Sequence, residues 1–146
     1  MKRDFVVLMF SIAFSFVLFG VLLTVSLKYS AWGQFAMNPR VNQASPATIA
    51  AEHPDVLPSL ERQIVVMHLL ILPFVCGAVG AVAGATARKP IYVAVLGVLP
   101  FRVLIMTSDS LRLLTILSLL LDIGVAVGCS VLIAHIRGGR TLVKSV

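Results

Sequence analysis

Long apolar stretches alternate with short polar ones along the 146 residues of the chain. Four apolar segments stand out, at about residues 5–27, 60–87, 91–106 and 111–136. A helix needs roughly 20 apolar residues to cross a bilayer, and three of the four segments are that long. The third has only about 16 residues and contains Pro100, so it either crosses where the membrane is thinner or re-enters on the same side. The pattern predicts an all-α integral membrane protein, a four-helix transmembrane bundle with a single domain.

The polar stretches mark the connections between these segments. Residues 28–59 form a predicted outer loop with four prolines, residues 107–110 a tight turn, and residues 137–146 a basic cytoplasmic tail. Pro73 lies inside the second apolar segment and removes one helix hydrogen bond there. We therefore expect that helix to kink near residues 69–72.

Composition supports the membrane assignment. Hydrophobic residues make up 59% of the chain and charged residues 12%, whereas a soluble domain is nearer half apolar and a quarter charged. The net charge is +6, which in a soluble protein would point to nucleic acid. If the N-terminus is inside, however, seven of the basic residues and one carboxylate face the cytoplasm, and the outer charges cancel. The positive-inside rule then places both termini in the cytoplasm and explains the charge without nucleic acid.

Glycines recur at helix spacing in two of the segments. Gly77, Gly80 and Gly84 share one stripe of the second segment, and Gly124 and Gly128 form a second GxxxG motif in the fourth. Such stripes let helix backbones approach closely. The two motifs lie at similar depths, so we expect the second and fourth helices to pack through them. Contact between copies of the chain, or the wall of a conduction path, are the alternatives.

Asp122 is the residue most suggestive of chemistry. It lies about 16 Å from the outer end of the fourth segment, near the bilayer centre, where a carboxylate is costly. Ser118 and Thr115 share its helix face. A structural hydrogen bond or ion pair is the first interpretation of this carboxylate. A proton or cation site is the second, and in that case Asp122, Ser118, Thr115 and Arg102 are the candidate binding residues.

Arg102 is the other ionisable residue within a predicted span. It lies about 7 Å inside the outer end of the third segment, and its depth differs from that of Asp122 by about 9 Å. We therefore expect its side chain to extend outward to the lipid headgroups rather than to pair with Asp122.

Metal and cofactor motifs are not evident in the sequence. Cys76 and Cys129 each stand within an apolar run, as buried small side chains do. His68 and His135 differ in depth by about 25 Å, so one haem cannot take both as ligands. The glycines follow no strand and precede no GK[ST], which excludes a phosphate-binding loop. We expect no metal and no cofactor.

These features favour a non-enzymatic multi-pass protein over an enzyme, because no nucleophile, base and acid converge. We expect an accessory or assembly subunit whose GxxxG helix faces contact other membrane subunits or a second copy. The alternative is a small oligomeric transporter or channel, coupled to protons or cations through Asp122. The lipid bilayer is the expected surrounding, and a bacterial inner membrane is the default location, since the chain has no glycosylation sequon or organelle signal.

Overall fold

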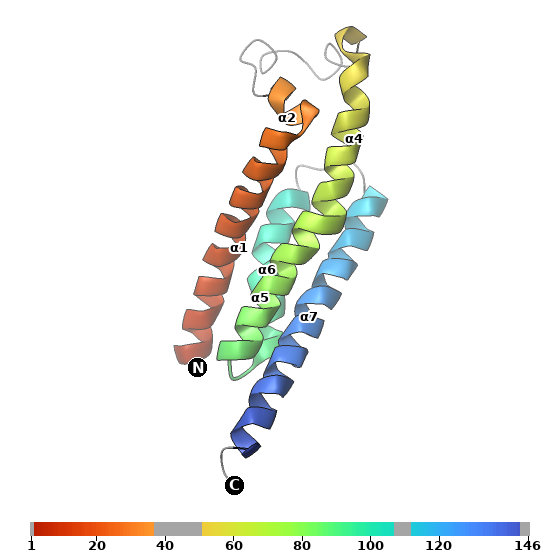
Figure 1. The fold of residues 1–146 in the computed structure, drawn as a ribbon. Helices are drawn as coiled ribbons and strands as arrows, with labels where there is room; N and C mark the ends of the chain where they lie inside the picture. Colours follow the sequence, from red (N-terminus) through yellow and green to blue (C-terminus); the bar gives the residue numbers. More distant parts are fainter. Residues whose placement is uncertain (1, 37–50, 107–111, 144–146) are drawn as a thin grey trace.

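The computed structural model describes residues 2–36, 51–106 and 112–143, without side chains at 104–106, 112–115 and 139–143. The described part is almost entirely helical (Figure 1). Its elements are α1 (Lys2–Tyr29), α2 (Ala31–Ala36), η1 (Pro54–Val56), α4 (Leu57–Val66), η2 (Met67–Ile71), α5 (Leu72–Thr86), α6 (Pro90–Met106) and α7 (Arg112–Val143).

Three helical stretches in the described ranges are long and apolar enough to cross a membrane. They are Lys2–Tyr29, the continuous run Pro54–Thr86, and Ile116–Gly138 within α7. The apolar part of α6 is shorter, at Pro90–Val103. The structure therefore supports the prediction of a helical membrane protein. That α6 completes a fourth crossing stays a prediction.

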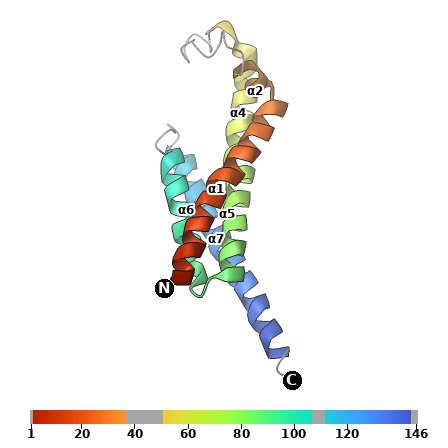
Figure 2. The same cartoon turned by 90° about the vertical axis from the view of Figure 1, so that its left-hand side faces the viewer.

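The long helices run side by side, with α5 in contact with α1, α6 and α7 (Figures 1 and 2). The N-terminus of α1 and the link between α5 and α6 lie at one end of the bundle (Figure 1). Asp4 ties them together, because its Oδ1 accepts a hydrogen bond of 2.8 Å from the backbone N–H of Arg88. We call this the basic end, after its exposed cations Lys2, Arg3, Arg88, Lys89 and Arg137.

The sequence predicted a kink near residues 69–72, and at this place the structure has a π-helical turn. Residues Met67–Ile71 form a π-helical turn, in which the N–H of Leu72 bonds the carbonyl of Met67 five residues back. Proline has no N–H for the carbonyl of Leu69, and a widened turn is one way for a helix to absorb that loss. Residues on the two sides of the turn therefore do not share one continuous 100° register.

Small side chains fill the middle of the bundle. A buried cluster joins α5 and α6 to Ala126 of α7 and consists of Cys76, Val79, Ala83, Ala87, Val93, Ala94, Val98 and Ala126. Nearer the other end, Phe101 packs edge-on against Phe16 and Phe19 of α1, with ring centroids 5.6 and 4.9 Å away. Most of α1 is otherwise exposed, as its bulky apolar sequence suggests for a helix that faces lipid.

The glycine stripe of α5 lies against α7, but the partner surface is not the predicted one. A Cβ built on Gly80 would clash with the backbone of Ala126, and one built on Gly84 would clash with that of Ser130. Ala126 and Ser130 are themselves a pair of small residues four positions apart, which gives one close-packed seam. Side chains built on Gly124 and Gly128 meet nothing within 4 Å. The prediction that these two glycines pack on α5 is therefore wrong, because they lie on the opposite, exposed face of α7.

Two predicted boundaries also shift. Helix α7 ends at Val143 rather than at residue 136, so most of the stretch predicted as a tail is helical. The predicted outer loop contains α2, whose Trp32 N–H donates to the hydroxyl of Ser59, and residues 37–50 of this loop lie outside the described part.

Candidate functional site

A buried ion pair joins α6 to α7. The Nε of Arg102 lies 3.0 Å from Oδ2 of Asp122, and neither side chain is accessible to solvent. Moving two charges out of water costs several kcal/mol each, and their attraction offsets this only when geometry and hydrogen bonds are good. Arg102 has such a bond, since its Nη2 donates to the hydroxyl of Ser118 at 2.7 Å. Asp122 and Ser118 are four residues apart, so one turn of α7 presents both groups to the guanidinium.

The predicted outward course of Arg102 is wrong. Its side chain is the largest fully buried one among the described residues, and it points to α7 instead of the headgroups. The depth argument fails because it located only the two backbones, and the side chains of Arg102 and Asp122 together close the distance between them. The first interpretation of Asp122, a structural ion pair, agrees with this contact.

Two further buried groups, on α5 and the turn before it, belong to the electrostatic surroundings of the pair. His68, on the π-helical turn, is fully buried and interacts electrostatically with Asp122. Its Nδ1 lies 3.0 Å from the carbonyl oxygen of Ile64. A carbonyl only accepts, so Nδ1 carries the proton of this contact. Cys76, also fully buried, lies within electrostatic range of both Asp122 and Arg102.

Helix α5 packs against the same face of α7 that carries its buried polar residues. Ser118, Asp122, Ala126 and Ser130 follow one another at steps of four residues, and all are buried. The sequence predicted that α5 packs against Gly124 and Gly128 of α7. Instead the polar face alone is enclosed, and it carries both the ion pair and the small residues that α5 approaches. Thr115 also lies in α7, but its side chain is outside the described residues.

The surroundings limit what the pair can do. The pockets of 410 to 630 Å³ that described residues line are at the surface of the bundle, and Asp122 lines none of them. Both carboxylate oxygens of Asp122, and Nε and Nη1 of Arg102, are buried and make no hydrogen bond within the described part of the chain, so their 3.0 Å contact is an ion pair only. These atoms retain capacity to bind a proton or a water, but the paired charges already neutralise each other. The geometry is that of an internal electrostatic link between helices.

Sequence reasoning missed His68 and the Ala126–Ser130 pair. A 100° projection of the sequence, which takes no account of the π-helical turn, puts His68 opposite the glycine stripe of α5. The small-xxx-small spacing of Ala126 and Ser130 was a signal available in the sequence, but GxxxG is the more conspicuous motif.

Comparison with known proteins gives no assignment. The chain matches no protein-family model, and neither the curated proteins nor the solved structures compared with it yielded a match. The function has to be argued from the chain itself.

Proposed function

We propose that this chain is a non-enzymatic multi-pass membrane protein that serves as an accessory or assembly subunit, with both termini in the cytoplasm. The observation that carries the proposal is the exposed face of α7. Its exposed positions Leu117, Leu121, Gly124, Gly128 and Val131 follow alternating steps of four and three residues. This is the spacing of a helix that packs along another helix, with the two glycines at its centre.

The internal contacts of the chain support the same proposal. The glycine stripe of α5 already packs against α7, and the side chains of Asp122 and Arg102 already contact each other. Gly124 and Gly128 are thus open to a helix from elsewhere, either another subunit or a second copy. Small residues on such a face let the partner backbone approach closely, which is where association in lipid gains its packing energy.

Affinity purification in mild detergent tests this proposal. We expect the tagged wild-type protein to retain a second polypeptide or a second copy of itself. Gly124→Leu and Gly128→Leu should release that partner while the protein keeps its abundance. Gly20→Leu is the matched control, because Gly20 is a glycine of α1 whose added side chain also meets nothing within 4 Å. A wild-type protein that purifies as a lone monomer, or glycine variants that keep the partner, would contradict the proposal.

One variant distinguishes the transporter alternative from the accessory subunit. Asp122→Asn keeps the size of the side chain and removes its charge. If the ion pair is structural, this variant lowers abundance and no ion flux is lost. An intact, assembled Asp122→Asn protein that has lost a proton- or cation-dependent flux would instead identify a transporter.

A further inference from the structure

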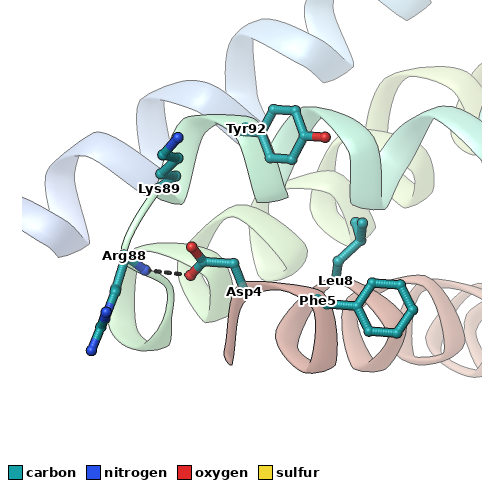
Figure 3. A pocket seen from close by; sticks show the side chains of 6 residues that line it. All are labelled: Asp4, Phe5, Leu8, Arg88, Lys89 and Tyr92. Carbon is teal, nitrogen blue, oxygen red and sulfur yellow. Dashed lines mark hydrogen bonds between the residues drawn. The ribbon is translucent and has the colours of Figure 1, made fainter. Parts of the chain in front are cut away.

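A pocket of about 630 Å³ opens at the basic end of the bundle, between α1 and the start of α6. Figure 3 shows its lining: Asp4, Phe5 and Leu8 come from α1, Arg88 and Lys89 from the α5–α6 link, and Tyr92 from α6. The floor is apolar and the rim is charged. This combination, at the level where a helix bundle leaves the bilayer, resembles the boundary between lipid chains and headgroups.

The charges of the rim favour an anion. Asp4 is the single carboxylate in the lining, and its Oδ1 is occupied by the backbone N–H of Arg88. Arg88 and Lys89 add two positive charges, which leaves a net charge of +1 in the lining. The Arg88 side chain extends away from the pocket in Figure 3, whereas Lys89 stands on the same side as Tyr92. Lys89 is therefore the cation that a ligand in the pocket would meet.

A second apolar groove begins at the same two residues. It has a volume of about 600 Å³ and shares Lys89 and Tyr92 with the first pocket. From there it follows the outer face of α6 along Pro90, Ile91, Val95 and Leu96. The seven helical steps from Lys89 to Leu96 span about 10 Å. The two pockets thus share one cation, Lys89, and the side chain of Tyr92.

We propose that this corner binds one anionic phospholipid. The phosphodiester contacts the ammonium of Lys89, and one acyl chain lies in each groove. The single negative charge of a phosphodiester complements the net +1 of the lining, and two grooves fit a two-chain lipid. A free phosphate would leave both apolar surfaces uncovered. Basic pockets between membrane helices on the cytoplasmic side are a general setting for anionic headgroups.

Native mass spectrometry of the full-length protein in detergent tests the site, with phosphatidylglycerol as the probe and phosphatidylcholine for comparison. We expect the wild-type protein to retain phosphatidylglycerol preferentially. Lys89→Gln should weaken this binding about fivefold, since one cation near an anionic lipid contributes about that factor. Lys28→Gln is the matched control: it removes the same charge beside a tyrosine, Tyr29, at the other end of α1. Binding that Lys89→Gln leaves unchanged, or that Lys28→Gln weakens equally, would overturn the proposal.

A groove variant tests the acyl chains separately from the charge. Leu96→Trp narrows the second groove and keeps Lys89, so it should weaken phosphatidylglycerol binding without altering the helix content of the protein. Millimolar inorganic phosphate should not displace the lipid. If phosphate displaces it, or if Leu96→Trp has no effect, the corner is a simple anion site and the lipid proposal is wrong.

Discussion

Nε of Arg102 lies 3.0 Å from Oδ2 of Asp122, and both side chains are fully buried between α6 and α7. The hydroxyl of Ser118 completes the contact by accepting from Nη2 of the same guanidinium. A buried pair of this kind contributes little net stability compared with an apolar contact of equal volume, but losing one partner leaves a costly charge behind. We therefore expect the pair mainly to fix how α6 is set against α7.

Removing one partner of this pair should be far more damaging than removing both. We expect Asp122→Leu to lower the free energy of unfolding by about 3–5 kcal/mol, because Arg102 then stays buried without its counter-charge. The double variant Arg102→Met/Asp122→Leu should recover most of this loss. Thermal unfolding in detergent, followed by circular dichroism, measures both effects.

Ser118→Ala provides a graded control for the same site. It deletes one hydrogen bond to a charged group and should cost about 1.5–3 kcal/mol. The interpretation of the pair as a register-fixing link would fail if the double variant were as unstable as Asp122→Leu.

Much of the helix pattern could be predicted from the sequence, because segment length and hydropathy report directly on a bilayer. A distortion of the helix just before Pro73 was predictable for a similar local reason. Proline has no N–H, so the helix has to change its hydrogen bonding in the preceding turn. Which face of a helix meets which neighbour is a different matter. That choice depends on small rotations, such as the one the π-helical turn introduces, that no single segment records.

The site itself was half predictable. Asp122 stood out because a carboxylate at that depth needs a partner, and this reasoning holds. The identity of the partner was missed, because a depth difference along two helices says little about how far a long side chain can reach. Gly124 and Gly128 were assigned to the wrong face for a comparable reason: their spacing indicates close approach of some helix, but not of which one.

The contact of Gly80 with Ala126 gives a second stability prediction. A Cβ on Gly80 would lie 2.9 Å from the carbonyl carbon of Ala126, and this obstacle is backbone. Gly80→Val should therefore push α5 and α7 apart and destabilise the protein by about 1–3 kcal/mol, the usual cost of overpacking. Gly20→Val, on the open face of α1, should leave the melting temperature within a degree or two of the wild type under the same conditions. Equal melting temperatures for the two variants would show that the seam is not tightly packed in the membrane.

The orientation of the chain can be tested by cysteine labelling. In a background with Cys76→Ala and Cys129→Ala, we expect a membrane-impermeant maleimide to reach Lys89→Cys from the cytoplasmic side. It should reach Ser108→Cys from the other side, because a complete crossing by α6 separates the two positions. Labelling of both from one side would mean that α6 re-enters, and the C-terminus would then lie opposite the N-terminus.

We expect Arg137 to stabilise the C-terminal end of α5 by hydrogen bonds to its carbonyls. Its Nη1 donates to the carbonyl of Ala85 at 2.9 Å and its Nη2 to that of Ala87 at 3.2 Å. The last carbonyls of a helix have no partner within the helix, so the guanidinium from α7 bonds two groups that otherwise depend on water.

Arg137→Ala should speed hydrogen exchange of the amides in the last turn of α5 by about tenfold, equivalent to roughly one hydrogen bond. Arg137→Lys should restore only part of the protection, because an ammonium lacks the planar fork that reaches both carbonyls. Arg3→Ala removes an exposed cation from the same end of the bundle and should leave these amides unchanged. If it speeds their exchange as much as Arg137→Ala does, the protection comes from the charge of the basic end and not from the two hydrogen bonds.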